Sequence, residues 1–122
     1  MKREIKFRGK RIDNGEWIYG MPTYDFRYIF NGEQLDSIDN YEVTPETVSQ
    51  FTGLKDKNGI EIYEGDIFKF VDLALEVRFK KGCFLAYRNG EQEGIIAEYP
   101  KMYEVIGNIH DDLSLLNSDK ED

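Results

Sequence analysis

The feature that most constrains the fold of this chain is a set of Asn-Gly pairs. Four are present, at Asn14-Gly15, Asn31-Gly32, Asn58-Gly59 and Asn89-Gly90. Asn and Gly both tolerate positive φ angles, which the type I′ turns of two-residue β-hairpins require and most other residues resist. Lys81-Gly82 is a further candidate turn. The pairs recur at irregular intervals, so they predict separate hairpins and not a solenoid repeat.

The segments between these turns alternate between apolar and polar residues with the period of a β-strand. Ile5 and Phe7 alternate with Lys6 and Arg8 before the first pair. Further alternating apolar sets are Trp17, Tyr19 and Met21; Phe26, Tyr28 and Phe30; Leu75, Val77 and Phe79; and Tyr103 and Val105. The pattern predicts a mainly-β fold of short antiparallel strands.

Helix is expected in only two short places. Thr44 is a candidate N-cap for a helical turn that begins at Pro45, with Glu46 in its first turn. This turn, at about 45–50, would connect N-terminal strands (about 3–44) to C-terminal strands (about 51–110). A second helical turn is expected from Asp111 or Asp112 through 113–116, followed by a polar tail at 117–122. No linker divides the chain, so residues 1–116 are predicted to form a single domain.

Length and composition agree with one folded domain. The chain has 122 residues, of which 40% are hydrophobic and 14% aromatic, enough for a modest core without disulfides or a structural metal. The apolar runs are too short to cross a bilayer, and the N-terminus has no apolar signal segment. Cys83 is the only cysteine. We therefore expect a cytoplasmic protein without a membrane segment.

Charge is unevenly distributed along the chain. The net charge is -8, but residues 1–13 carry six basic and two acidic groups, which leaves -12 for the rest. Overall acidity disfavours generic nucleic-acid binding, since phosphate contacts need clustered Lys and Arg. Lys6, Arg8 and Lys10 share one face of the first strand, and Trp17 follows in the next. These four residues are the candidate interaction surface.

The stretch "QFTGLKDKNGIEIYEGDIF", residues 50–68, raises the question of a cation site. When Gly59 is aligned with the invariant glycine of an EF-hand, Asp56 and Asn58 fall at ligand positions. Leu54 and Gly65 then occupy the first and last ligand positions, where neither side chain can coordinate. We therefore interpret the stretch as a hairpin and a tight bend. Its residues with expected structural roles are Thr52, Gly53, Asp56, Asn58, Gly59, Tyr63, Gly65 and Asp66.

No catalytic constellation is evident. Cys83 and His110 are the only cysteine and histidine, and neither their spacing nor their neighbours resemble a nucleophile–base pair. We read Cys83 as a small packed hydrophobe and His110 as structural. Carboxylates are too numerous in this acidic chain to indicate a general acid and base. The aromatic series that starts at Trp17 is either core or a stacking platform, and half-buried strand faces favour core. No catalytic, cofactor-binding or metal residues are predicted.

Three segments together resemble the YopX family of small phage and prophage proteins: "REIKFRGKRIDNGEWIYG", the central stretch above, and "YEVIGNIHDD". The resemblance runs from Arg3 to about Leu116. It implies a mainly-β pseudobarrel of two packed antiparallel sheets with many short turns and very little helix. It also implies an origin in a bacteriophage or prophage. The family offers no catalytic residues to carry over.

The leading functional hypothesis is a non-catalytic accessory protein that acts by protein–protein contact, as a homo-oligomer or on a host protein. Nucleic-acid binding through the basic first strand and the aromatics near Trp17 is the alternative. A small hydrolase is the least supported class, since nothing in the sequence supplies its catalytic groups.

Overall fold

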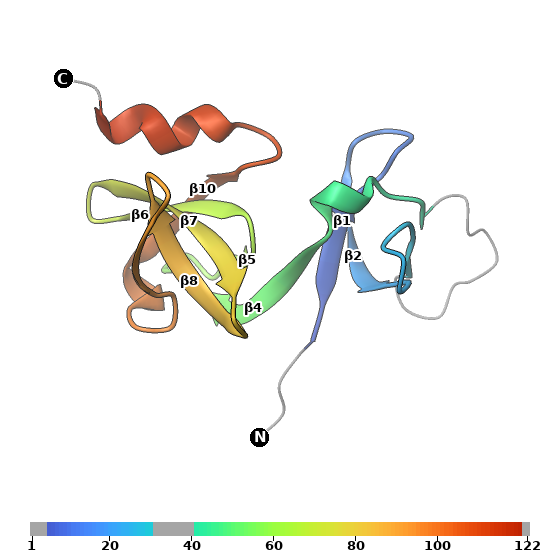
Figure 1. Ribbon diagram of the computed structural model, residues 1–122, viewed down its shortest axis with the longest axis horizontal. Coiled ribbons are helices and arrows are strands. Elements are labelled where there is room, and N and C mark those ends of the chain that lie inside the picture. Colours follow the sequence, from blue (N-terminus) through green and yellow to red (C-terminus); the bar gives the residue numbers. More distant parts are fainter. Residues whose placement is uncertain (1–4, 31–40, 121–122) are drawn as a thin grey trace. The chain divides into compact units, whose positions relative to one another are not determined.

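The computed structural model describes residues 5–30 and 41–120 (Figure 1). The chain divides into two compact units, Met1–Phe51 and Thr52–Asp122. Within the described residues the regular structure consists of β-strands and short 3₁₀ helices. The prediction of a mainly-β fold with very little helix is confirmed.

The strands form two antiparallel five-stranded sheets. The first has the order β3-β2-β1-β4-β5, with β1 at Phe7–Lys10, β2 at Trp17–Pro22, β3 at Ile29–Phe30, β4 at Ser49–Lys55 and β5 at Glu61–Tyr63. The second has the order β10-β6-β7-β8-β9, with β6 at Asp66–Phe70, β7 at Leu73–Lys80, β8 at Cys83–Arg88, β9 at Glu91–Ile95 and β10 at Tyr103–Asn108. Both sheets keep open edges among these strands. The prediction of two antiparallel sheets is confirmed.

The turns only partly follow the type I′ expectation. Asn89 and Gly90 both have positive φ (57° and 81°), as do Lys81 and Gly82 (52° and 80°), so these two hairpins match it. At the first and third Asn-Gly pairs only the glycine has positive φ, so a type I′ turn is wrong there. Longer loops explain the difference: the Gly59 N–H donates to the Asp56 carbonyl, and the Asp56 N–H donates to the Ile60 carbonyl. The Asn31-Gly32 prediction lies outside the described residues.

The core of the first unit is small. Ile18, Ile29 and Val43 are buried and contact one another. Gly9 of β1 lies against this cluster, and a Cβ there would sit 3.0 Å from Ile29 Cδ1 and 3.2 Å from Val43 Cβ. A side chain at Gly9 would therefore force the core apart.

The core of the second unit joins strands of both sheets. Ile62 of β5 is fully buried against Phe68 of β6, Val77 of β7 and Tyr103 of β10. Leu54 of β4 contacts the same cluster from a partly buried position. Within this unit, the end of the first sheet thus packs on the second sheet.

The helical segments are short and of the 3₁₀ type. Pro45–Thr47 (η2) occurs where the sequence predicts a turn, but Thr44 makes no side-chain cap; instead the Thr47 hydroxyl donates to the Thr44 carbonyl at 2.6 Å. Pro100–Met102 (η3) was not expected. Leu113–Lys120 (η4) confirms the C-terminal helical expectation and continues into the segment expected to be a polar tail.

The C-terminal helix η4 lies beside β7 and β10. Gly107 of β10 permits this approach, since a Cβ there would come within 2.5 Å of Leu115 Cδ1. None of the helices in residues 5–30 and 41–120 is long and apolar enough to span a membrane.

Candidate functional site

The central stretch is held by its own backbone. The buried Asp56 carboxylate accepts three backbone N–H bonds: Oδ1 from Asn58 (2.8 Å) and Ile60 (2.9 Å), and Oδ2 from Val105 (2.9 Å). The first two close the β4–β5 loop, and the third attaches that loop to β10. Asp56 is therefore a structural acceptor that joins segments 49 residues apart.

Side-chain-to-backbone hydrogen bonds also form on either side of Asp56 in the sequence. The Thr52 hydroxyl donates to the Ile62 carbonyl at 2.7 Å across β4 and β5, and Gly53 beside it has a φ of +88°. The Tyr63 N–H donates to the buried Asp66 carboxylate at 2.8 Å across the bend. Gly65 at that bend has a φ of +87°, and its carbonyl accepts from the Ile109 N–H at 2.9 Å.

A metal function has no support at this stretch. In the part of the chain that the structure describes, no three His, Cys, Asp or Glu side chains gather closely enough to hold a metal ion. The oxygens of Asp56 that an EF-hand would direct at calcium face backbone N–H groups instead.

The basic residues of the first strand lie over aromatic rings of the same unit. The Arg8 guanidinium is 4.1 Å from the centroid of the Trp17 ring, and Lys10 Nζ is 5.2 Å from it. Lys6 Nζ is 5.2 Å from the Phe51 centroid. Lys10 is also the cross-strand partner of Trp17. The structure thus brings Arg8 and Lys10 of the candidate interaction surface onto Trp17, whereas Lys6 lies over Phe51.

Burial limits what this surface offers. Arg8 is only 6% exposed, and Phe51 only 5%. Further along β2, Tyr19 is 41% exposed and Met21 is 50% exposed, while Ile18, which precedes Tyr19, is in the core. The accessible part of this face is therefore aromatic and apolar more than cationic.

The turn that follows β2 presents two aromatic side chains. Residues 23–28, here called the aromatic loop, contain Tyr24, which is 99% exposed, and Phe26, which is 45% exposed. Phe26 has a φ of +63°, a left-handed conformation that is rare for a bulky residue and is held only where surrounding contacts fix it.

Asp25 supplies several of those contacts. Its carboxylate accepts from the Thr23 hydroxyl (2.7 Å) and from the Arg27 N–H (3.1 Å), and these bonds, the hydroxyl first, lower the pKa of Asp25 below its ordinary value. The Phe26 N–H also donates to the Thr23 carbonyl at 2.9 Å.

This loop was not predicted. The alternation of Phe26, Tyr28 and Phe30 predicts one strand, with core packing favoured over a stacking platform for the aromatic series, and for Phe26 this prediction is wrong. The strand is only Ile29–Phe30, and its fully buried residue is Ile29, of the opposite parity. Thr23 and Asp25 are loop-forming residue types and were the available signal.

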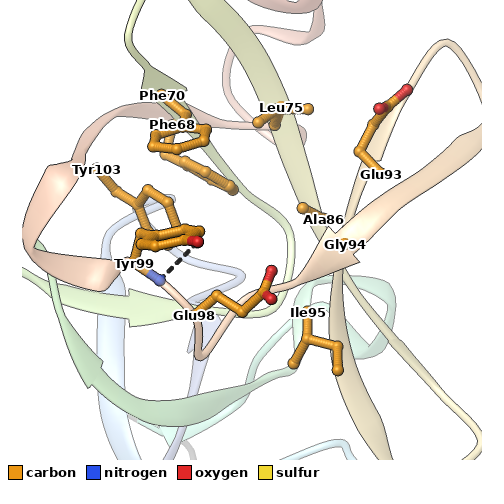
Figure 2. Close-up of a pocket in the computed structure, with 10 residues that line it drawn as sticks. All are labelled: Phe68, Phe70, Leu75, Ala86, Glu93, Gly94, Ile95, Glu98, Tyr99 and Tyr103. Atoms are coloured by element: carbon orange, nitrogen blue, oxygen red, sulfur yellow. Dashed lines mark hydrogen bonds between the residues drawn. The ribbon is translucent and has the colours of Figure 1, made fainter.

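A pocket opens between the strands of the second sheet (Figure 2). Its volume is about 70 Å³, and its lining comes from β6 to β10 and the β9–η3 connection. The lining residues are Phe68, Phe70, Leu75, Ala86, Glu93, Gly94, Ile95, Glu98, Tyr99 and Tyr103.

Tyr103 forms the floor of this pocket and is 4% exposed. Its hydroxyl oxygen accepts a hydrogen bond from the Tyr99 N–H at 3.3 Å, drawn in Figure 2. Burial, with the neighbouring Glu98 carboxylate as a lesser cause, raises the pKa of the Tyr103 phenol above its ordinary value of 10.0.

The expectation that Cys83 is buried is wrong. Cys83 is exposed, because it directly follows the Lys81-Gly82 turn at the tip of the β7–β8 hairpin. His110 lies just after β10, where its N–H donates to the Asn108 side chain at 2.9 Å and its ring is close to Gly65.

The fold thus defines a small mainly-β protein. The side chains of its central stretch, residues 50–68, hold backbone segments in place through hydrogen bonds. The family model described as "YopX protein" matches residues 6–117, so the chain belongs to the YopX family, as its sequence motifs indicate. The crystal structure of protein EF1440 from Enterococcus faecalis is similar to this chain at 26% identity, with a TM-score of 0.61. The similarity covers 94% of this chain and 99% of that one. No curated protein matches.

Proposed function

We propose that this protein is a non-catalytic accessory protein of a phage or prophage that acts in the bacterial cytoplasm by self-association through the aromatic loop. The observation that carries the proposal is the exposure of Tyr24 and Phe26 on a hydrogen-bonded loop. Tyrosine is enriched among the residues that dominate binding energy, and a fixed loop loses little entropy on binding.

The strain at Phe26 supports a binding role. A left-handed φ at a bulky residue has an energetic cost, and such strain is typical of functional positions. A glycine at position 26 would avoid the cost, but it would remove the ring. The loop therefore keeps an exposed aromatic side chain at the expense of stability.

A second copy is the partner that the charges favour. The chain carries a net +4 within residues 1–13 and -12 elsewhere, so two copies offer each other surfaces of both signs. Pairing through the sheet edge at β9 is less favourable, since Glu91 and Glu93 place like charges along it. Side-chain contact through the loop avoids that repulsion.

Sedimentation velocity over a series of protein concentrations tests the proposal. We expect the wild type to self-associate, and Tyr24→Ser to weaken the association by about tenfold or more, as loss of an anchoring residue does. Because Tyr24 is 99% exposed, the substitution should leave the melting temperature unchanged. Ile12→Ser is the matched control: it removes a 56% exposed apolar side chain from a different loop and should leave association intact.

Three outcomes count against self-association. They are a wild type that stays monomeric at all concentrations, equal effects of Tyr24→Ser and Ile12→Ser, and a host protein captured only when Tyr24 is present. The last outcome would keep the binding role and replace the second copy by a host partner.

Nucleic-acid binding is the second candidate, favoured by the proximity of Arg8 and Lys10 to Trp17. It requires affinity that falls steeply with salt, and each charge removed should flatten the slope by about 1. We expect negligible affinity at physiological salt, because Arg8 is buried and the chain is acidic. A mobility-shift series on the wild type and on the triple variant Lys6→Glu, Arg8→Glu, Lys10→Glu distinguishes the two candidates.

A further inference from the structure

The pocket of Figure 2 combines aromatic walls with one inward-directed carboxylate. Phe70 lies between two tyrosine rings: its centroid is 5.8 Å from that of Tyr99, in a stacked arrangement, and 5.4 Å from that of Tyr103, edge to face. Phe68 contacts Tyr103 from the other side at 4.5 Å. Tyr99 is 52% exposed, so its ring is accessible to an incoming group.

Glu98 is placed to complete this site. Its side chain points into the space between Tyr103 and Ala86, whereas Glu93 extends away from it (Figure 2). The Glu98 carboxylate lies beside Gly94 of β9, where a Cβ would be 3.6 Å from Glu98 Oε1, an ordinary van der Waals distance. Within the part of the chain that the structure describes, no ion pair involves Glu98.

The chemistry of this arrangement selects an organic cation. Aromatic ring faces attract ammonium groups that lie within about 6 Å of the centroid, and a carboxylate adds a charge-assisted hydrogen bond. An inorganic ion is less suited, because most of the lining is apolar and provides few oxygen ligands.

The volume of the pocket limits which organic cation can enter it. The volume of about 70 Å³ exceeds the roughly 30 Å³ that one water molecule occupies, so the pocket has room for the end of an alkylammonium chain. A lysine side chain delivers such a group as a compact charge on a flexible stem. A guanidinium instead carries five donors in a rigid fork, more than a mostly apolar lining with few acceptors can satisfy.

We propose that the pocket formed by Phe70, Tyr99, Tyr103 and Glu98 binds the ammonium end of a lysine side chain from a partner protein. This site lies in the second unit and the aromatic loop in the first, so it goes beyond the proposed function and is tested by different variants. Failure of one proposal leaves the other standing.

The test uses n-butylammonium as a stand-in for the lysine side chain, titrated into the full chain and followed by NMR of the Tyr99 and Tyr103 ring signals. We expect saturable shifts of both. The neutral isostere 1-butanol and the guanidinium analogue n-propylguanidinium should both bind several-fold more weakly. A peptide with one lysine should bind at least as tightly as n-butylammonium and lose its affinity when the lysine is acetylated.

Two carboxylate variants provide the matched comparison. Glu98→Gln should weaken n-butylammonium binding by about tenfold, because it removes the charged acceptor and keeps the shape. Glu91→Gln removes an equal charge from the exposed start of β9, outside the pocket lining, and should change binding by less than about twofold. Tyr99→Leu should weaken binding several-fold while preserving apolar contact.

Four results would overturn the proposal. Equal binding of 1-butanol would show that the pocket selects only apolar groups. Equal effects of Glu91→Gln and Glu98→Gln would show general attraction to an acidic surface. Tighter binding of n-propylguanidinium would exclude lysine as the occupant, and unshifted Tyr99 and Tyr103 signals would exclude the site.

Discussion

Replacement of Asp56 by alanine gives the most direct test of the role assigned to the central stretch. The substitution removes an acceptor of three backbone N–H bonds from a side chain that is 5% exposed. A hydrogen bond to a charged group contributes about 1.5–3 kcal/mol. Water can replace the acceptor for Asn58 and Ile60, whose loop is exposed, but the partly buried Val105 N–H has poorer access to it. We therefore expect a loss of about 2–4 kcal/mol in the free energy of unfolding.

Urea unfolding followed by far-ultraviolet circular dichroism measures this loss. Trp17, the only tryptophan, lies in the first unit, so its fluorescence reports separately on that unit. Asn58→Ala is the matched control: it changes the neighbouring exposed side chain and should cost no more than about 0.5 kcal/mol. A loss of less than about 0.5 kcal/mol for Asp56→Ala would refute the structural interpretation. A rise of several degrees in the melting temperature on addition of calcium would do the same.

Four further predictions follow from local geometry. Gly59→Val should reduce the free energy of unfolding by about 1–2 kcal/mol, measured in urea, because its φ of +81° disfavours a β-branched residue although the space around it is open. Val71→Gly should instead increase it by about 1 kcal/mol, because Val71 is 75% exposed and has a φ of +61° in the β6–β7 turn; a decrease would contradict the strain inferred there. Cys83 should react rapidly with a mild thiol reagent in the native protein, and Cys83→Ser should alter stability by less than about 0.5 kcal/mol; protection equal to that of a buried thiol would argue against its exposed position. Burial raises the pKa of Tyr103 in the folded state, so its stabilising contribution is complete below the ordinary pKa of 10.0 and is lost as the pH rises through the folded value. The difference in free energy of unfolding between wild type and Tyr103→Phe should therefore shrink as the pH rises above about 10.

The candidate sites were only partly predictable. The sequence grouped Lys6, Arg8, Lys10 and Trp17. The structure places Arg8 and Lys10 over the Trp17 ring, because paired strands with period-two alternation bring such residues to one face, whereas Lys6 lies over Phe51. The pocket of Figure 2 could not be predicted, because its walls come from strands whose pairing no local pattern specifies. The aromatic loop was missed because the alternation of Phe26, Tyr28 and Phe30 also fits a strand.

The sequence by itself determined the elements that depend on neighbouring residues. Positive φ at Asn89-Gly90 and Lys81-Gly82 and the helical turn at Pro45 follow from preferences that act over a few residues. The YopX family model matches residues 6–117 of the same sequence.

Tertiary structure alone decided what each side chain does. The Asp56 carboxylate accepts a hydrogen bond from the N–H of Val105, which is 49 residues away. Glycine is required at position 9 only because Ile29 and Val43 pack against it. Cys83 is exposed although apolar residues follow it, because it is the first residue of β8 and lies at the tip of the β7–β8 hairpin, outside the core. Burial and partner choice depend on which distant strands meet, and the free energy of those contacts overrides the local preference of any single residue.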